Sequence, residues 1–320
     1  MIRPRTWMLV AIMLLLAAVP PIAALFAQPF YLDLLRRVMI FAIAAVSLNL
    51  ILGYGGMVSF GHAAYLGIGA YAVGVLAYHG IDNGWLQWAV AIGASALVAA
   101  AIGSISVRTS GIYFIMITLA FTQMLYYLGI SIEEYGGDDG MRLGVRSQFT
   151  GLIDLNDPTA FYYLVFAILV LFLYLTHRLV NSRFGLVLQA VRSNEARTRA
   201  IGFSPYPYRL AAFVISGAMC GLAGALLVNQ TAYLTPEFMN WTRSGELMFM
   251  VILGGIATTA GPLLGAAALL LLEDVLQGSS LLPKWVNDHW QLYLGVILIL
   301  VVLFARRGLA GLLPGRERND

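Results

Sequence analysis

The 320-residue chain contains one lysine, Lys284, and this bears directly on ATP chemistry. The loop that cradles ATP phosphates has the form Gly-x-x-x-x-Gly-Lys-Ser/Thr, because its backbone N–H groups and its lysine hold the phosphates. Lys284 follows Pro283 and precedes Trp285, so the chain lacks this loop. If the protein performs ATP-driven work, a separate chain must hydrolyse the ATP.

The histidines, the carboxylates and the lone cysteine form no recognisable catalytic or metal-binding pattern. His62 has no second histidine, cysteine or close carboxylate pair beside it, which argues against a metal site. Cys220 has no partner for an intrachain disulfide. The apolar stretches contain no serine–histidine, paired-aspartate or His-Glu-x-x-His arrangement. We therefore expect no catalytic residues and no cofactor.

Composition points to a membrane protein. Apolar residues make up 60% of the chain and charged residues 11%, against roughly 45–50% and about 25% in soluble domains. Lipid is the solvent that tolerates so much apolar surface, and helices satisfy their own backbone hydrogen bonds there. We predict one all-α integral membrane domain over residues 1–320. The net charge of +3 does not indicate nucleic acid, because the arginines fall between the apolar stretches.

The apolar stretches predict about ten transmembrane or partly re-entrant helices, since a crossing needs roughly 20 apolar residues. The eighth and tenth stretches are short, which indicates half-helices or re-entrant segments. The predicted spans are 8–27, 35–52, 60–79, 86–107, 111–130, 159–177, 209–230, 244–257, 262–278 and 291–305.

Basic residues indicate the orientation. Thirteen fall in one set of connections, and basic residues accumulate on the cytoplasmic side, so both termini are predicted to be cytoplasmic. Six fall in the other set, and they are Arg36, Arg37, Arg142, Arg146, Arg243 and Lys284. Arg36 and Arg37 run against the trend. The first span has an alternative interpretation as a signal peptide, because residues 24–27 resemble a cleavage site.

Two glycine clusters interrupt the predicted helices, one at 53–74 and one at 254–265. Irregular backbone is not tolerated against lipid, and paired glycine-interrupted segments mark the substrate path of many transporters. The alternative is close helix packing, which needs only small residues. An inverted repeat would place the clusters on opposite sides, whereas the span count places both at the cytoplasmic side. The predicted path residues are Gly55, Gly56, Ser59, His62, Gly254, Gly255, Thr258 and Thr259.

Glu246, Glu273 and Asp274 are acidic residues within or beside predicted spans. Charged groups are costly inside a bilayer, so we expect them near span ends, where they pair with Arg243 or reach the interface. An ion- or proton-coupled transporter, the alternative class, would carry such charges in mid-span.

The longest predicted cytoplasmic connection, 178–208, has an amphipathic pattern. Its apolar stripe is predicted to lie on one helix. That helix is expected to end at Gly202, and Pro205 prevents it from continuing. Such a helix lies along the membrane or inserts in a groove of a soluble partner. The stripe consists of Val187, Ala190, Val191, Asn194, Thr198 and Ile201, and the charged face carries Arg192, Glu195 and Arg199.

Four sequence blocks carry a family resemblance. They are Leu-Gly-Tyr-Gly-Gly-Met-Val-Ser-Phe-Gly-His-Ala-Ala-Tyr-Leu-Gly-Ile-Gly-Ala-Tyr (52–71), Gly-Ile-Tyr-Phe-Ile-Met-Ile-Thr-Leu-Ala-Phe (111–121), the connection at 182–203, and Leu-Gly-Gly-Ile-Ala-Thr-Thr-Ala-Gly-Pro-Leu-Leu-Gly-Ala (253–266). In this order and spacing, the chain resembles the LivM-like permease subunits of branched-chain amino acid ABC importers. The resemblance covers about residues 30 to 305.

The resemblance implies a transport subunit in the bacterial inner membrane, without enzyme activity of its own. It implies a second homologous permease, two cytoplasmic ATPase subunits and a periplasmic substrate-binding protein as partners. Urea, short amides, and aromatic or aliphatic carboxylates are alternative substrates within the wider family.

The resemblance also implies roles for two connections. The segment 185–203 is expected to seat against an ATPase, although Arg197 departs from the family pattern, and the outer connection 131–158 is expected to meet the binding protein. The alternative for that connection is a turn-rich solvated loop. The expected coupling residues are Arg192, Glu195, Ala196 and Gly202, and the expected docking residues are Gly136, Gly137, Asp138 and Asp139.

Overall fold

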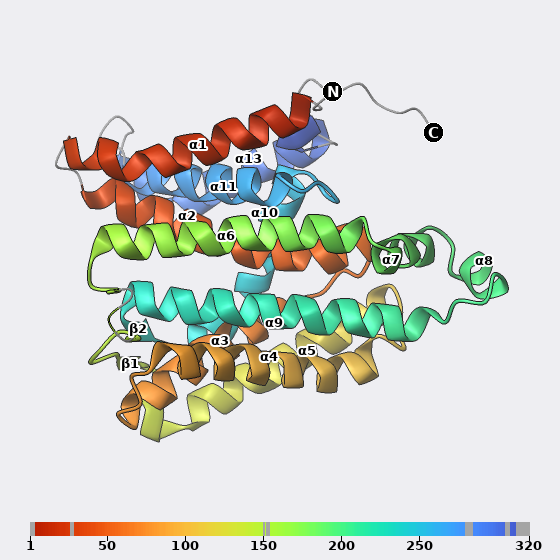
Figure 1. Cartoon of the computed structure of the whole chain (residues 1–320), viewed down its shortest axis with the longest axis horizontal. Helices are drawn as coiled ribbons and strands as arrows, with labels where there is room; N and C mark the ends of the chain where they lie inside the picture. Colours follow the sequence, from red (N-terminus) through yellow and green to blue (C-terminus); the bar gives the residue numbers. More distant parts are fainter. Residues whose placement is uncertain are drawn as a thin grey trace.

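The computed structural model describes residues 4–25, 29–149, 151, 154–278, 284–304 and 308–311. These residues form a bundle of α-helices with one small antiparallel sheet (Figure 1). The α-helices are α1 (Pro4–Leu25), α2 (Pro29–Asn49), α3 (His62–Tyr78), α4 (Gly84–Ser106), α5 (Ile112–Ser131), α6 (Pro158–Val180), α7 (Arg183–Ser193), α8 (Glu195–Ala200), α9 (Pro205–Thr231), α10 (Trp241–Gly254), α11 (Gly261–Gly278), α12 (Lys284–Asp288) and α13 (Trp290–Phe304). The other elements are η1 (Leu50–Tyr54), η2 (Glu133–Tyr135), η3 (Pro236–Met239), η4 (Leu309–Gly311), β1 (Met141–Arg142) and β2 (Tyr233–Leu234).

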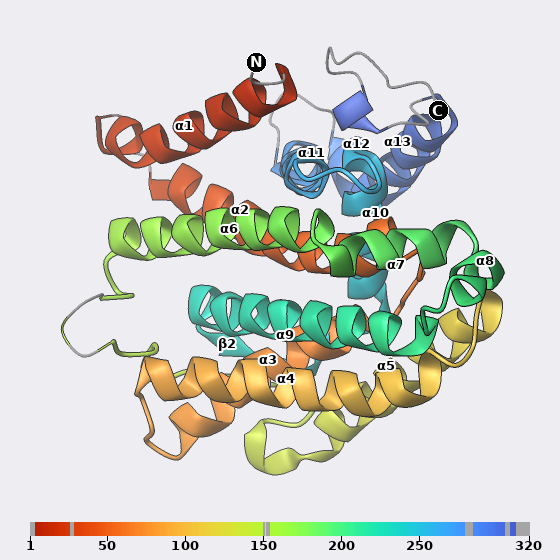
Figure 2. The ribbon, with the colours of Figure 1, turned by 45° about the vertical axis from the view of Figure 1, so that its right-hand side comes forward.

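The bundle has two distinct ends. The strands β1 and β2 lie at one end, which we call the sheet end, and α7 and α8 lie at the other, which we call the α8 end (Figure 1 and Figure 2). The long helices α2, α4, α6 and α9 run between these ends, so the axis joining them is the direction in which the chain crosses a membrane.

Six helical segments in the described part of the chain are long and apolar enough to cross a membrane. They are Phe30–Tyr54, Gly84–Ser106, Ile112–Ser131, Pro158–Val180, Pro205–Thr231 and Gly261–Gly278. Shorter apolar segments lie in α1, α3 and α13, and α10 has 14 residues. The all-α, multi-pass prediction is confirmed. Ten is an approximate number of helices, because four of the predicted spans are short.

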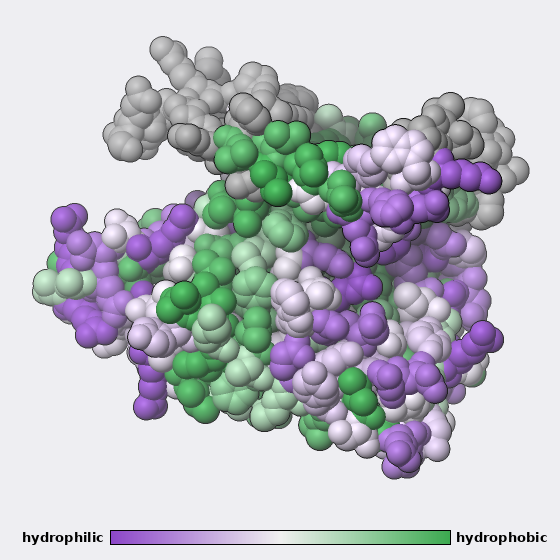
Figure 3. All heavy atoms as spheres, turned by 180° about the vertical axis from the view of Figure 1, so that it is seen from behind, coloured by the Kyte–Doolittle hydropathy of each residue, from purple (hydrophilic) through white to green (hydrophobic). Residues whose placement is uncertain are grey.

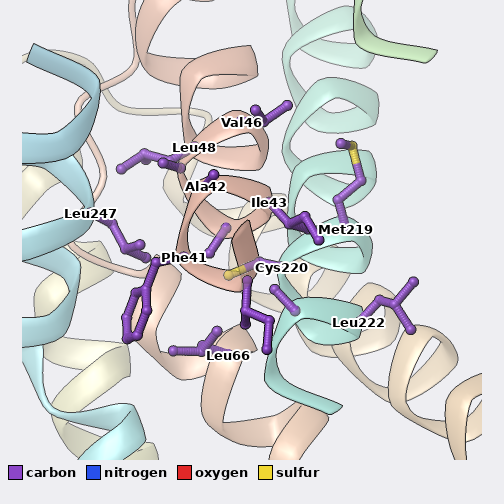
Figure 4. Close-up of a cluster of buried hydrophobic side chains, with 14 of the residues drawn as sticks. Phe41, Ala42, Ile43, Val46, Leu48, Leu66, Met219, Cys220, Leu222 and Leu247 are labelled. Atoms are coloured by element: carbon purple, nitrogen blue, oxygen red, sulfur yellow. The ribbon is translucent and has the colours of Figure 1, made fainter. Parts of the chain in front are cut away.

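The helices α2 and α9 form the centre of the bundle. In the most apolar stretch of each span, 83% of the residues are buried in Phe30–Tyr54 and 78% in Pro205–Thr231, against 22% in Ile112–Ser131. Side chains such as Ile43, Leu66 and Cys220 fill the space between α2, α3 and α9 (Figure 4). Most of α5 therefore faces outward, whereas α2 is enclosed by protein.

Glycines set the distance between α3 and α9. A methyl group added to Gly69 would lie 1.8 Å from the carbonyl oxygen of Gly221, and one added to Gly224 would lie 1.8 Å from that of Leu66. Small residues let two membrane helices bring their backbones into contact in this way. Part of the first glycine cluster therefore serves helix packing, the alternative that we considered for it.

The helix α3 begins inside the bundle rather than at its end. The preceding segment, 55–61, is not helical. Its Phe60 accepts a hydrogen bond from the Thr122 hydroxyl at 3.1 Å, and the N–H of Phe60 donates to Thr118 Oγ1 at 3.3 Å. Because Thr118 and Thr122 are central residues of α5, Phe60 lies about halfway between the two ends.

The helix α10 also begins inside the bundle, but its entry segment comes from the opposite end. After α9 the chain forms β2 at the sheet end and descends through η3, where Met239 packs on Gly67 of α3. The Ser244 hydroxyl in the first turn of α10 then donates to the Phe60 carbonyl at 2.7 Å and accepts from the Ala63 N–H at 2.9 Å. The first turns of α3 and α10 thus meet halfway through the bundle.

This junction corrects two expectations. The inverted relation is not between the two glycine clusters: Gly53–Gly56 of the first cluster and the second cluster both lie at the α8 end, while the rest of the first cluster continues along α3 toward the sheet end, where Gly74 packs on Leu234. Instead, α3 and α10 are inverted relative to each other. Both begin halfway through the bundle, but the chain reaches α3 from the α8 end through 55–61 and reaches α10 from the sheet end through 232–240.

The expectation that Arg243 lies in an outer connection is wrong, because it belongs to the first turn of α10 beside the mid-bundle Ser244. Glu246 lies near the start of its helix as expected, but that start is at mid-bundle depth and not at the interface. Arg243 and Glu246 form the expected ion pair, at 2.8 Å.

The outer connection 131–158 carries more structure than a solvated loop. Met141 pairs with Leu234 in the antiparallel ladder of β1 and β2, and Gln148 bridges to Asn83 ahead of α4. These pairings fix the described part of this connection to the sheet ends of α4 and α9.

The predicted single helix in 178–208 is instead two helices, α7 and α8. Asn194 between them has an extended backbone (φ −158°, ψ 103°), and its side chain accepts from the Arg197 N–H at 2.9 Å, which caps α8. Val191 and Thr198 of the predicted stripe are buried, whereas Ile201, which follows the last residue of α8, is 65% exposed. Pro205 begins α9, a position that tolerates proline because its missing N–H needs no partner there.

The first two helices pack as integral parts of the bundle. The Tyr162 hydroxyl of α6 donates to the Leu16 carbonyl of α1 at 2.8 Å. Arg36 of α2, which ran against the charge trend, is buried beside Asp33, and its guanidinium lies 4.6 Å from the Phe161 ring centre. The predicted cleavage site at 24–27 lies partly outside the described residues.

We predict that Gly69→Val destabilises the protein by about 1–3 kcal/mol or more, because the side chain must push α3 away from α9. The measurement is thermal unfolding of the purified protein in detergent. The matched control is Gly93→Ala in α4, where an added methyl group meets nothing within 4 Å. Equal unfolding temperatures for the two variants would contradict the proposed close contact.

Candidate functional site

The two glycine clusters meet at the α8 end, where Asn49 joins them. Asn49 at the end of α2 accepts a hydrogen bond from the Ala257 N–H at 3.0 Å and donates to the Thr258 carbonyl at 2.9 Å. Gly53 lies directly against the Ala257 backbone, and Ala257 packs against the buried cluster that contains Tyr54. The predicted path residues after α2 and after α10 therefore belong to one cluster, which we call the inner cluster.

Close backbone contacts in the inner cluster extend to α11 and to the C-terminal segment. A methyl group on Gly254 would lie 1.8 Å from the Gly261 carbonyl oxygen, and one on Gly265 would lie 1.7 Å from that of Met250. The backbone at Gly308 packs on Gly255. These glycines serve the packing of α10 on α11, so their types alone do not establish a path.

The helix α7 is attached to the inner cluster through Arg192. The Arg192 guanidinium donates to the Gly53 carbonyl at the end of η1, and its aliphatic chain covers Gly56. Gly56 has φ +68°, a left-handed conformation that glycine adopts without strain, and a methyl group there would lie 2.8 Å from Arg192 Cγ. One predicted coupling residue therefore touches two residues at the break after α2.

The helix α8 is linked by charge to the start of α9. Glu195 pairs with Arg199 at 2.5 Å within α8 and with Arg209 of α9 at 2.8 Å. Ala196 is exposed, and Gly202 follows α8 with φ +94°. The predicted coupling residues thus divide into Arg192, which contacts the inner cluster, and Glu195, Ala196 and Gly202, which lie on or beside α8.

Ser59 and His62 lie apart from the inner cluster, at the mid-bundle junction. Both are fully buried. His62 Nε2 lies 2.7 Å from Ser216 Oγ, and the Ser216 hydroxyl donates to the Ser47 carbonyl. Because that hydroxyl has one proton, Ser216 accepts from His62, which assigns the tautomer with hydrogen on Nε2. This chain of hydrogen bonds ties α3 to α9 and α2.

The predicted path residues therefore occupy two places. Ser59 and His62 lie at the mid-bundle junction, whereas Gly55, Gly56, Gly254, Gly255, Thr258 and Thr259 lie in the inner cluster. Together they follow the axis of the bundle from its middle to the α8 end.

The predicted docking residues lie at the sheet end on a folded surface. Asp138 and Asp139 are exposed, and Gly137 is buried beneath them. The Tyr233 hydroxyl donates to the Asp139 carbonyl, so β2 holds this turn in place. An exposed acidic turn anchored in this way presents a defined surface at the sheet end.

Comparison with known proteins places this architecture in a family. The family described as the branched-chain amino acid transport system / permease component matches residues 30–303. The chain belongs to this family. It is a permease component of an ABC importer and a multi-pass membrane protein, and it is not an enzyme.

Relatives of this permease component come from bacteria and an archaeon. The high-affinity branched-chain amino acid transport system permease protein LivM of Escherichia coli is 28% identical over 301 residues, covering 87% of this chain and 69% of the relative. A probable LivM of Methanocaldococcus jannaschii is 25% identical over 329 residues, covering 87% and 93%. LivH of Escherichia coli is 24% identical over 290 residues, covering 85% and 91%.

The sequence reasoning missed the polar residues that hold the breaks together. Asn49, Ser244, Thr118 and Thr122 carry these hydrogen bonds, and none of them was singled out. A usable signal was present, because a polar residue inside an apolar run is expensive unless it has a partner. Asn49 is the clearest example, since it ends a long apolar run just before the first glycine cluster.

We predict that Asn49→Ala destabilises this permease component, because the Ala257 N–H and the Thr258 carbonyl lose their partner. Each unsatisfied buried group costs about 1–3 kcal/mol. Thermal unfolding in detergent measures the effect. Ser104→Ala is the matched control, because the Ser104 hydroxyl donates to the Ala101 carbonyl of its own helix at 2.7 Å, and the substitution keeps the backbone carbonyl that accepts from Tyr206. A smaller effect for Asn49→Ala than for Ser104→Ala would contradict the role of Asn49 as a bridge.

Proposed function

We propose that the whole chain, residues 1–320, acts as one permease domain forming half of the path by which an ABC importer moves branched-chain amino acids or similar small solutes. The observation that carries this proposal is the pair of helices, α3 and α10, that begin halfway through the bundle in a member of this permease family. Discontinuous helices at the membrane midplane are typical of substrate paths in transporters. The names of the relatives LivM and LivH support branched-chain amino acids as the substrate class.

The proposed assembly contains a second homologous permease, two cytoplasmic ATPases and a periplasmic substrate-binding protein. The chain is similar to both LivM and LivH of Escherichia coli, which supports pairing between two related permeases. The missing phosphate-binding loop supports ATP hydrolysis on other chains. The bilayer is the solvent of the outer helices, since large apolar side chains such as Leu97 are exposed on them.

The proposed orientation in the inner membrane has the α8 end in the cytoplasm. Arginines gather at this end, and basic residues accumulate on the cytoplasmic side. The helix α1 starts on this side of the bundle (Figure 1), and Gly308, after α13, packs there on Gly255. Both features support cytoplasmic termini. The sheet end, with its exposed Asp138 and Asp139, then faces the periplasm and receives the binding protein.

The connection 178–208 is proposed to transmit the ATPase movement. The helix α8 extends beyond the long helices at the α8 end (Figure 1 and Figure 2). Movement of α8 reaches α9 through the Glu195–Arg209 pair, and movement of α7 reaches the break after α2 through Arg192 and Gly53. Both routes lead from the cytoplasmic surface to helices that end in the candidate path.

Reconstitution tests the proposed function. The chain, the second permease, both ATPases and the binding protein are placed together in liposomes, and uptake of radiolabelled leucine, isoleucine and valine is measured. We expect uptake that requires ATP and every component. Gradient-driven uptake by the chain alone would instead establish an ion-coupled transporter.

We predict that Glu195→Arg lowers ATP-driven uptake at least about tenfold while membrane insertion stays intact. The substitution places a third positive charge between Arg199 and Arg209, and like charges at such distances repel. Uptake and insertion are measured on the same membranes. Arg199→Ala is the control, because it removes one partner of Glu195 and leaves the pair with Arg209. Normal uptake by Glu195→Arg would remove its assigned role.

A further inference from the structure

An ion pair lies at the middle of the bundle on a surface that is partly exposed. Arg243 Nη1 and Glu246 Oε2 of α10 are 2.8 Å apart, and their side chains are 28% and 40% exposed. Ser244, between them, bonds to Phe60 and Ala63 at the junction halfway along α5. The pair therefore sits at mid-membrane depth.

This pair does not hold two helices together. Arg243 and Glu246 are three residues apart on α10, so their ion pair is internal to the first turn of one helix. The contacts that join α10 to α3 are made by Ser244 instead. An intrahelical pair contributes little to tertiary structure, and burying charge in a bilayer is costly. Its presence therefore calls for a reason other than packing.

The surroundings exclude lipid as the neighbour of this surface. Charged side chains at membrane depth face the bundle interior or a water-filled cavity. Hydrophilic side chains reach from the sheet end toward the middle of one face of the molecule, where they interrupt its apolar surface (Figure 3). A methyl group on Gly245, beside the pair, would find only the Phe60 ring, at 3.9 Å. The surface beside the pair is therefore open in this chain, and charges at this depth need a water-filled cavity or protein beside them in the assembled transporter.

We propose that Arg243 and Glu246 form a subsite for the charged groups of a zwitterionic α-amino acid in transit. The guanidinium binds the substrate carboxylate through paired N–H donors, and the Glu246 carboxylate accepts from the substrate ammonium group. The two protein charges neutralise each other when the site is empty and exchange partners when the substrate enters. The inference rests on the proposed function and adds to it a site that selects against solutes lacking either charge.

The first test neutralises both charges with the double variant Arg243→Gln and Glu246→Gln in the complete reconstituted transporter. The pair is partly exposed and internal to one helix, and such pairs contribute little to stability, so co-purification with the partner subunits should be unchanged. We expect leucine uptake to fall at least about tenfold, since charge-assisted hydrogen bonds to the substrate are lost. Uptake within about twofold of the unaltered transporter would overturn the proposal.

Glu273→Gln in α11 is the matched control for loss of an acidic residue. Glu273 accepts a hydrogen bond from Gln277 of the same helix at 3.2 Å and takes no part in the Arg243–Glu246 ion pair. This variant should keep leucine uptake within about twofold.

The second test does not depend on neutralising the pair. Gly245→Cys places a thiol beside it, and the native Cys220 is fully buried. A charged methanethiosulfonate reagent reacts only with thiols in water. We expect it to modify Gly245→Cys in the assembled transporter, and excess leucine with the binding protein to slow the reaction. No modification, or modification that leucine leaves unchanged, would overturn the subsite.

Leu97→Cys in the middle of α4 provides the comparison, because Leu97 is 73% exposed on an apolar surface. This thiol should react only after the protein is denatured.

Different outcomes contradict the proposed function and the Arg243–Glu246 subsite. If the unaltered transporter takes up no branched-chain amino acid, the proposed function fails. If it does and the double variant does equally well, only the Arg243–Glu246 subsite fails.

Discussion

Every backbone polar group at membrane depth needs a partner inside the protein, because hydrocarbon supplies none. The breaks before α3 and α10 depend on this constraint. Ser244 binds the Phe60 carbonyl and the Ala63 N–H, while Thr118 and Thr122 bind the remaining groups of Phe60. Side-chain hydroxyls thus replace the helical hydrogen bonds that the broken helices give up, and they do so where α3, α5 and α10 converge.

The same constraint connects the middle of the bundle to its α8 end. After α10, the Asn49 side chain accepts from the Ala257 N–H and donates to the Thr258 carbonyl. The Arg192 guanidinium donates to the Gly53 carbonyl at the end of η1. The inner cluster is therefore held by side chains from α2 and α7 rather than by regular helix. Side-chain contacts of this kind are easier to exchange than a helical ladder, which suits the rearrangement that we propose for this region when α7 and α8 are moved.

The sequence predicted the larger organisation well. Apolar runs located the long helices, and the amphipathic connection before α9 was expected at the α8 end. Prediction failed where a short helix starts at an unusual depth. The short eighth stretch indicated a half-helix, but hydropathy does not report where along the membrane normal an apolar run begins, so the charge count placed the start of α10 at the outer surface. Arg243 and Glu246 were misplaced for this reason. The break between α7 and α8 was missed because it depends on the Asn194 side chain, which caps α8. Apolar periodicity does not detect a cap of this kind.

The sequence by itself determined that this chain lives in a bilayer and that any ATP-driven work needs another chain to hydrolyse the ATP, because apolar content and the phosphate-binding loop are properties read from the chain alone. Only the tertiary structure decided which glycines serve packing and which polar residues meet. Gly69 faces Gly221 and Asn49 faces Ala257 across about 150 and 200 residues of chain. Such pairs form only when helices distant in sequence are brought into contact, because a hydrogen bond or a close backbone approach is a relation between two positions.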